Sequence, residues 1–310
     1  MKQLIALVLL FSSISTMLVA KSDFVPEIVN PLTQSWRWKQ FPELDGKGVR
    51  DIAEGKDKSV WFALNEGVYR YDGYHWTLYN QAHGLDDSPI EQLLVTESNE
   101  VYACSSYGIY LYKEGIWYNK FPMPERTPFK FKKLTQLLDG TIAATSNRGI
   151  VLLKNEKVTI YSSKRRIANL KPLFEVLQWI ALPEENTNDK DFSDISDILL
   201  DHEDRVWIAL TVAGEKGKVL SFPKEELFKP IISNYTIYSS NQQIQLGENQ
   251  KIIEAQDGAI WVINSSFRAG ISIYREEQWE YIKLSDQFSG DEHITDIAEV
   301  YRFHFPSLKV

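Results

Sequence analysis

The sequence contains little of the chemistry that marks a metal site or a disulfide framework. Its 310 residues include one cysteine, Cys104, and five histidines. A single cysteine excludes an intramolecular disulfide and any zinc site made of several thiolates. No two histidines form an H-x-x-x-H or H-E-x-x-H pair, so the spacing predicts neither a metal centre nor a cofactor. Cys104 ends a strand-like apolar run, and we expect it to be a small buried core residue.

Net positive charge and familiar catalytic motifs are also missing. The chain has 34 Lys and Arg residues against 42 Asp and Glu residues, which gives a net charge of −8. A protein that tracks nucleic-acid phosphates normally carries a basic patch. The densest basic cluster is Lys164-Arg165-Arg166, which we expect to be a solvated loop. No Walker loop, G-x-S-x-G elbow or dinucleotide fingerprint occurs. We therefore predict no nucleic-acid partner and no catalytic residues.

Long apolar runs are absent except at the start of the chain. Lys2 precedes the apolar residues 4–11, polar residues follow, and Ala20 stands just before Lys21. This is the layout of a secretory signal peptide. We predict a signal peptide at residues 1–20, a linker at 21–33, and a mature protein in the periplasm or outside the cell; an uncleaved signal anchor is the alternative. No later run reaches 18 apolar residues, so we expect no membrane span after signal removal.

Aromatic residues are abundant and recur at a fixed spacing. They make up 13% of the chain, with nine Trp and fifteen Tyr, and flat rings favour strands. In four segments an apolar residue stands nine positions before an aromatic one. A fifth copy, aligned on Ile142, breaks this rule because Lys133 stands nine positions before it. The early period of about 40 residues is that of a four-stranded propeller blade. The four regular pairs are Ile52 and Trp61, Leu93 and Tyr102, Ile198 and Trp207, and Ile252 and Trp261.

Turn signals within the copies complete the predicted fold. In the first copy, Asp72-Gly73 is a two-residue hairpin signal between the third and fourth strands. The sequence therefore predicts an all-β fold, a β-propeller of four-stranded antiparallel blades over residues 34–310. It predicts about five full blades and a partial or closing sixth.

Three regions depart from the regular repeat. Residues 162–194 form an insertion, for which helical spacing indicates a short surface helix. Residues 36–41 look like an outer strand with no blade before it, and residues 293–299 repeat residues 49–54 and open a sixth blade. The two ends could complete one blade and close a ring. Because the final segment lacks the expected Asp/Gly turn and the Trp, we favour instead a truncated chain or a degenerate last blade. The helical spacing is carried by Leu173, Val176, Leu177 and Ile180.

The repeats resemble the two-component regulator propeller repeat, whose pattern runs roughly I-x-D-x-x-G-x-x-W-x-G-T-x-x-G-[LV]-x-x-[YF]-[DN]-G. Trp61, residues 67–73 and Trp76 match it, and residues 257–261 match its centre. The usual Gly-Thr after the Trp is absent, and the sequence shows no kinase motif. The resemblance covers about residues 34–300. It implies a propeller that serves as the periplasmic sensor region of hybrid histidine kinases, often in bacteria that sense polysaccharide breakdown products.

The candidate ligand-binding residues stand just before predicted third strands. Such loops fall on one face of a propeller, and loops often carry binding sites. We predict an exported, non-catalytic sensor or binding module whose partner is an oligosaccharide, another small ligand or a protein. The alternatives are a secreted lyase or hydrolase acting on a saccharide, and a truncated remnant of a larger sensor kinase. The candidate residues are Tyr107, Asn147, Phe267 and Arg268.

Overall fold

The computed structural model describes residues 40–121, 129–170, 178–183, 192–212, 217–240, 244–246, 251–264 and 270–283. The chain divides into two compact units, Met1–Asp45 and Gly46–Val310. In the first unit the described residues contain one short 3-10 helix, η3 (Pro42–Leu44), closed by a hydrogen bond from the Asp45 N–H to the Pro42 carbonyl. All further description concerns the second unit.

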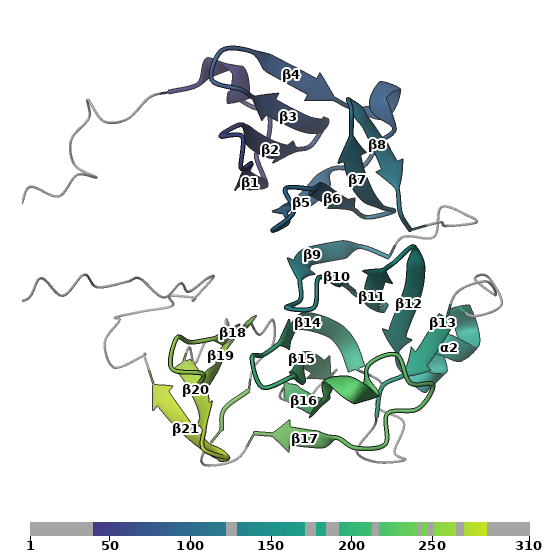
Figure 1. Ribbon diagram of the computed structural model, residues 1–310, viewed down its shortest axis with the longest axis vertical. Helices are drawn as coiled ribbons and strands as arrows, with labels where there is room; N and C mark the ends of the chain where they lie inside the picture. Colours follow the sequence, from purple (N-terminus) through teal and green to yellow (C-terminus); the bar gives the residue numbers. More distant parts are fainter. Residues whose placement is uncertain are drawn as a thin grey trace, which may run out of the picture. The chain divides into compact units, whose positions relative to one another are not determined.

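The second unit is built from five sheets that follow one another along the chain (Figure 1); their strands are antiparallel except for β13, the fifth strand of the third sheet. The short helices beside them are η4 (Gln81–His83), α2 (Lys164–Leu170) and η6 (Lys224–Glu226). Blade 1 comprises β1 (Asp51–Glu54), β2 (Val60–Leu64), β3 (Gly67–Tyr71) and β4 (Trp76–Tyr79); blade 2 comprises β5 (Ile90–Val95), β6 (Val101–Ser105), β7 (Ile109–Lys113) and β8 (Ile116–Asn119); blade 3 comprises β9 (Phe131–Gln136), β10 (Ile142–Ser146), β11 (Gly149–Lys154), β12 (Lys157–Ser162) and β13 (Gln178–Ala181); blade 4 comprises β14 (Phe192–Leu200), β15 (Arg205–Val212), β16 (Lys218–Pro223) and β17 (Thr236–Ser239); blade 5 comprises β18 (Lys251–Glu254), β19 (Ile260–Asn264), β20 (Gly270–Arg275) and β21 (Gln278–Lys283).

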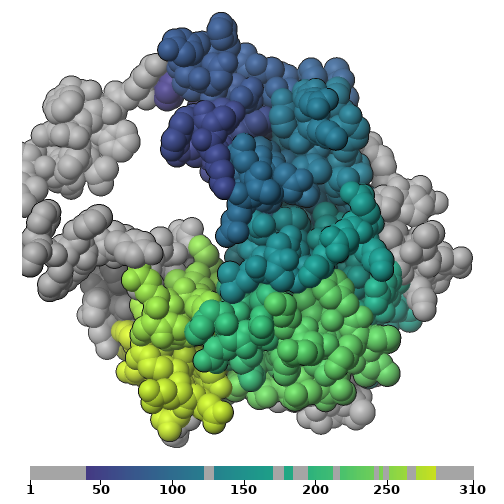
Figure 2. Space-filling model, viewed as in Figure 1, coloured from purple at the N-terminus to yellow at the C-terminus, as the bar shows by residue number. Residues whose placement is uncertain are grey.

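Each blade packs face to face on the next, with the first strands of successive blades in contact (Figure 2). The strands within a blade are hydrogen-bonded in chain order, so the first strand is the inner one and the fourth is the outer one. Apolar residues on both faces of the middle strands are buried between neighbouring blades. This arrangement confirms the predicted β-propeller fold and its five full blades. Cys104 is a fully buried residue of β6, as expected.

The register of blade 3 corrects the sequence alignment by one residue. In every blade the residue at the Trp61 position pairs with an inner-strand residue eight positions earlier, and in blade 3 that residue is Ala143, which pairs with Thr135. Aligning on Ile142 was therefore wrong. When blade 3 is aligned on Ala143, the residue nine positions earlier is Leu134. An apolar residue then stands nine positions before the Trp61 position in all five blades. An alanine carries no aromatic signal, which is why the sequence alignment moved to its larger neighbour.

The insertion after blade 3 differs from its sequence prediction. Its described helix is α2, which begins at Lys164, so the basic cluster that we expected to be a loop is helical. Ile180 lies in β13, which pairs in parallel with β12 and gives blade 3 a fifth strand. Residues 171–177, where most of the helical spacing falls, lie outside the described residues. No helix in the described part of the chain is long and apolar enough to span a membrane.

Side chains of the inner strands link consecutive blades through backbone hydrogen bonds. The Leu93 N–H of blade 2 donates to the Asp51 carboxylate of blade 1 at 2.8 Å. Gln92 accepts from Leu134 of blade 3 in the same way. These acceptors occupy equivalent positions. Asp51 stands one residue before Ile52, and Gln92 stands one residue before Leu93. Because the donors are buried N–H groups, each acceptor removes a desolvation cost that the next blade would otherwise carry.

Asp197 is the most heavily used of these acceptors. It is 1% exposed and lies on β14. It accepts from the Ile252 N–H of blade 5 at 2.9 Å and from its neighbour Ile198 at 2.8 Å. Lys133 of blade 3 holds the acceptor position of its own blade but cannot accept, and its ammonium instead pairs with Asp197. One carboxylate therefore joins blades 3, 4 and 5.

The predicted end segments lie largely outside the described residues. This applies to residues 36–39 and to residues 293–299. Gln40 and Phe41 are described and lie in no strand.

We expect Asp51→Ala to lower the free energy of unfolding by about 1–3 kcal/mol, because the Leu93 N–H would be left buried without an acceptor. Asp51→Asn keeps a side-chain oxygen and should cost under about 1 kcal/mol. Urea unfolding of the two variants checks this. Equal losses for alanine and asparagine would contradict the role of the oxygen.

Candidate functional site

Four aromatic rings fill the interface between blades 1 and 2. They lie at fixed positions, on the second and fourth strands of blade 1 and on the third and fourth strands of blade 2. Their centroids are 4.9–6.4 Å apart, and Trp61 and Tyr79 are stacked at 6.0 Å. We call this set the ring quartet. Its members are Trp61, Tyr79, Tyr112 and Trp117.

The interface between blades 4 and 5 repeats the ring quartet. Its centroids are 5.1–6.4 Å apart, and Trp207 and Tyr238 are stacked at 6.0 Å. The same ring geometry occurs at two of the four interfaces between described blades; at the interface between blades 3 and 4, Ala143 stands at the Trp61 position. Aromatic pairs at such distances stabilise beyond the area they bury. The members of this second quartet are Trp207, Tyr238, Tyr274 and Trp279.

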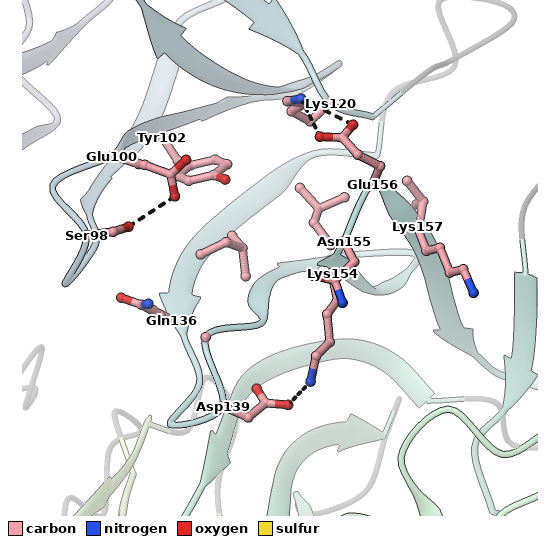
Figure 3. Close-up of a pocket in the computed structure, with 14 residues that line it drawn as sticks. Ser98, Glu100, Tyr102, Lys120, Gln136, Asp139, Lys154, Asn155, Glu156 and Lys157 are labelled. Carbon is pink, nitrogen blue, oxygen red and sulfur yellow. Dashed lines mark hydrogen bonds and ion pairs between the residues drawn. The ribbon is translucent and has the colours of Figure 1, made fainter.

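The interface between blades 2 and 3 lacks this filling and holds a cleft instead (Figure 3). The strand registers place Tyr102, Lys120, Leu153 and Val158 at the four quartet positions. One tyrosine remains, and a lysine and two aliphatic residues replace three rings. A cleft of about 420 Å³ is lined by all four of these residues. We call it the blade 2–3 cleft.

Charged and polar groups from turns border the blade 2–3 cleft. One ion pair joins the two blades across the cleft, Lys120 with Glu156 at 3.2 Å. A second lies within blade 3 at the edge of the cleft, Lys154 with Asp139 at 2.5 Å. Figure 3 shows Tyr102 and Glu100 on the blade 2 side, facing the turn that carries Lys154 and Glu156. The floor is apolar. The remaining lining residues are Ser98, Gln136, Gly140, Ile142, Asn155 and Lys157.

Two residues that line the cleft, Tyr102 and Asp139, have shifted pKa values. Burial, with the charges of Glu100 and Glu156, raises the pKa of Tyr102 to about 12. Its hydroxyl therefore stays protonated at physiological pH and can donate a hydrogen bond. Burial acts to raise the pKa of Asp139, but hydrogen bonds from Lys154 and Thr141 outweigh it and lower the pKa overall. Asp139 is therefore ionised and remains paired with Lys154.

The turn that carries Glu156 is strained. Asn155 and Glu156 have φ values of 48° and 62°, the left-handed region that two-residue hairpin turns require. Asparagine tolerates this region well, but glutamate has no such advantage and costs about 1 kcal/mol there. Strained residues of this kind gather at functional sites. Here the strained glutamate is the one that reaches Lys120 in the neighbouring blade.

The two sequence-predicted site residues that the structure describes do not line this cleft. Tyr107 and Asn147 are in the turns before β7 and β11, whereas the cleft is bordered by the turns at the other end of these strands. Tyr107 donates its N–H to Ser105 at 3.0 Å. The Asn147 Oδ1 atom is buried and accepts no hydrogen bond from the described residues. Phe267 and Arg268 lie outside the described residues, so these four remain a prediction.

A second cleft, of about 600 Å³, lies between blades 4 and 5 beside the second ring quartet. His202 lines it, and its Nδ1 atom pairs with the Glu254 carboxylate of the next blade. The pKa of His202 is raised by this hydrogen bond, by the charge of Glu254, and less strongly by Glu203 and Asp201. The His202 ring packs over Gly258, where a Cβ atom would stand 2.7 Å from it. We call this the blade 4–5 cleft.

An arginine covers one of the two tryptophans of each ring quartet. The Arg70 guanidinium lies 5.4 Å from the Trp61 ring, and that of Arg205 lies 5.6 Å from the Trp207 ring. The two arginines come from different positions. Arg70 pairs with Trp61 across the sheet, where blade 4 has Ser221. Arg205 stands two residues before its tryptophan, where blade 1 has serine.

The comparisons with known proteins support the fold. No family model matches the sequence, and no curated protein matches it. Among solved structures, virginiamycin B lyase from Staphylococcus aureus is similar at 16% identity and a TM-score of 0.51, over 76% of this chain and 70% of that one. The extracellular domain of the hybrid two component system BT3049 from B. thetaiotaomicron is similar at 14% identity and a TM-score of 0.42, over 81% of this chain and 36% of that one. YCF48 bound to D1 peptide is similar at 12% identity and a TM-score of 0.48, over 79% of this chain and 70% of that one.

The similarity to virginiamycin B lyase supports the β-propeller fold and nothing finer. The similar structures include an enzyme, an extracellular domain of a signalling system and a peptide-binding protein. All are under 20% identical to this chain, so none transfers an activity. Among the described residues, no group of three or more His, Cys, Asp and Glu side chains could hold a metal ion.

The blade 2–3 cleft could have been found from the repeat itself. At the fourth-strand position, blades 1 and 4 carry Tyr79 and Tyr238, and blade 2 carries Lys120. At the Trp117 position, blade 3 carries Val158. The signal is a departure from the repeat, which becomes visible only once the register of each fourth strand is known.

We expect the link between His202 and Glu254 to make stability depend on pH. The folded pKa of His202 is raised above 6.5, so its contribution is complete below that pH and is lost as pH rises through the folded pKa. Melting temperatures measured across neutral to mildly alkaline pH should fall for the natural protein. His202→Gln should be less stable at low pH and should lose this step. Parallel profiles for the two proteins would contradict the link.

Proposed function

We propose that this protein is an exported, non-catalytic β-propeller that binds a small polar ligand in the blade 2–3 cleft and acts as a sensor or binding module. One observation carries the proposal. The chain fills two of its blade interfaces with ring quartets but replaces three of the four rings at the interface between blades 2 and 3. Packing alone gives no reason for this loss, because well-packed interfaces are more stable than clefts.

The cleft suits a ligand with both polar and apolar faces. Its volume of about 420 Å³ lies in the range of small-molecule sites. Leu153 and Val158 offer an apolar floor, and the protonated Tyr102 hydroxyl offers a donor. Lys157 is exposed on the rim, and no described residue forms an ion pair or hydrogen bond with its ammonium. An oligosaccharide has this mixture of ring faces and hydroxyl groups, which makes it our first candidate.

The proposed cellular location, outside the inner membrane, rests on the first residues of the chain. Residues 1–20 have the composition of a signal peptide, and the repeat resembles those of periplasmic sensor regions. Export would bring the cleft into contact with ligands outside the inner membrane. A protein partner would then read the bound state, because the chain shows no kinase motif of its own.

Rebuilding the quartet tests the proposal directly. We expect the triple variant Lys120→Tyr, Leu153→Tyr, Val158→Trp to fold with at least the natural melting temperature, because the rings fill the cleft as they do between blades 1 and 2. We expect it to lose any melting-temperature increase that neutral or acidic oligosaccharides cause in the natural protein.

A matched control adds a ring outside the cleft. Ile116→Trp enlarges a 40% exposed residue of β8 that does not line the cleft, so binding should persist. A natural protein that shows no shift with any oligosaccharide of the panel or with a periplasmic extract would count against the proposal. Equal shifts in the natural protein and the triple variant would move the ligand elsewhere.

A second candidate function is favoured by the histidine of the blade 4–5 cleft. His202 and Glu254 come from separate blades and are paired through Nδ1. This leaves Nε2 for proton transfer at the wall of a cleft of about 600 Å³. Such an arrangement fits a lyase or hydrolase acting on a saccharide, and it is the alternative to a binding role.

Activity assays separate the two candidates. If the enzyme assignment holds, the natural protein should release unsaturated or reducing ends from a polysaccharide panel, and His202→Ala should lower kcat/KM about 100-fold or more. His75→Ala changes an exposed histidine with no lining role and should leave the rate unchanged. Turnover that survives His202→Ala would reject this site, and no turnover on any polysaccharide would leave the binding role in place.

A further inference from the structure

Blade 4 has a long loop where other blades have a tight hairpin turn. The connection between β16 and β17 covers residues 224–235, whereas blades 2, 3 and 5 make the same connection in two residues. We call residues 224–235 the blade 4 loop. It folds back on itself around the buried Glu226 carboxylate, which accepts from the Lys229 ammonium at 2.8 Å and from the Ser233 N–H at 2.9 Å. These two bonds lower the pKa of Glu226 to about 2, so the carboxylate stays ionised and holds the loop together.

The blade 4 loop packs into the interface between blades 3 and 4. At this interface Ala143 stands at the Trp61 position. Leu227 and Ile232 of the loop are buried in the same hydrophobic cluster as Ala143. Phe228 packs against this cluster and is half-buried. The loop is therefore part of the packing between two blades.

Three contacts hold Phe228 against blade 3. Its N–H donates to the Tyr161 hydroxyl at 2.7 Å, and its carbonyl accepts from the Gln178 side-chain amide at 3.3 Å. Its ring centroid lies 5.7 Å from the Lys154 ammonium, which is a cation–π distance. The φ of Phe228 is 71°, a strained value for a bulky residue. Such strain persists only where the surroundings enforce it, as these contacts do.

Lys154 also belongs to the blade 2–3 cleft. It lines the cleft, and Figure 3 shows it reaching from its hairpin to Asp139, a second lining residue. One cation is thus shared between the edge of the cleft and the Phe228 ring. Asp139 has its own link to the loop. A hydrogen bond to Asp204 raises the pKa of Lys224 in the loop, and the charge of Asp139 adds to this effect. Both members of the ion pair therefore interact with the blade 4 loop.

We propose that the blade 4 loop positions the ion pair of Lys154 and Asp139, and thereby couples the blade 2–3 cleft to the outer surface of blade 4. This coupling rests on the binding role proposed for the cleft. Phe228 and Asp139 together hold the Lys154 ammonium in one place, so a ligand meets a preorganised edge. Because coupling between two sites is reciprocal, a ligand that engages this edge stabilises the loop. The loop also carries Ile231, which is 75% exposed, so a protein partner can contact the segment that responds.

Hydrogen exchange of the loop amides tests the positioning without any ligand. We expect Lys154→Met to raise the exchange rate of the blade 4 loop at least about tenfold, because the cation beside Phe228 is lost. Lys154→Arg keeps a cation and should keep the natural rate. Lys157→Met removes an exposed cation from the same hairpin and should change nothing. Equal exchange of the loop in Lys154→Met and Lys157→Met, or faster exchange of blade 1 to the same extent as the loop, would overturn the proposal.

A double variant separates the ring contact from the ion pair. Lys154→Met leaves the Asp139 carboxylate, whose side chain is 9% exposed, without its cation. Adding Asp139→Asn removes that charge, and the loop should exchange as fast as in the single variant. A return to the natural exchange rate in the double variant would assign the effect to the unpaired carboxylate, and this would overturn the positioning role of Phe228.

The reverse direction is measured at the cleft. The probe is the oligosaccharide of the panel that raises the natural melting temperature most. It should slow exchange of the blade 4 loop, and its affinity should fall about fivefold or more in Phe228→Leu, which keeps apolar bulk but has no ring. Ile231→Ala changes an exposed residue of the same loop and should leave the affinity unchanged.

The outcomes separate this inference from the proposed function. Natural affinity in Phe228→Leu would overturn the coupling and leave the binding role of the cleft in place. A panel in which no oligosaccharide binds would reject the binding role and the coupling to a ligand. The exchange rates of the Lys154 variants would then still decide whether the loop positions this residue.

Discussion

A blade with apolar side chains on both faces is stable only when each face is pressed against a neighbour. This constraint governs the whole of the described structure. The hydrophobic clusters are shared between blades, and the largest buried rings lie between sheets. The inner strands add a directional element, since Asp51, Gln92 and Asp197 each offer an oxygen to the backbone of the following blade. Burial therefore supplies most of the free energy, and the acceptors fix the order and offset of the sheets.

The same constraint explains why the blade 2–3 cleft is informative. An interface can lose three rings only if the rest of the fold tolerates the lost packing. Here the ion pairs of Lys120 and Lys154 occupy the edges of the space that the rings would fill. Both cations are tied to carboxylates, so the cleft is held open by side chains that are themselves satisfied. A site of this kind is preorganised before a ligand arrives.

Much of the fold could be predicted from the sequence because the repeat is carried by large residues. Trp61, Trp207 and Trp261 mark their strands unambiguously, and turn residues such as Gly73 mark the hairpins. Where the residue at the repeat position is small, the alignment of the repeat was wrong by one residue, as at Ala143. The helix α2 was missed because its sequence is short and basic, with few apolar residues to set a period.

The candidate site was harder to predict than the fold. Loops before third strands were a reasonable expectation for a propeller, and the clefts described above are lined by neither Tyr107 nor Asn147. A cleft between blades depends on which fourth-strand residue faces which neighbour, and that depends on strand register. Lys120 gives no sign in the sequence that it stands where three other blades have tyrosine.

The arginine that covers each quartet tryptophan has one further consequence. In blade 1 the arginine, Arg70, lies on the third strand, and a serine stands two residues before the tryptophan. In blade 4 the arginine, Arg205, stands two residues before the tryptophan, and it donates to Ser221 on the third strand at 2.6 Å. Two different positions thus place a cation over the equivalent indole. Exchanging the side chain at one of these positions alone would leave that indole with two guanidinium groups or with none.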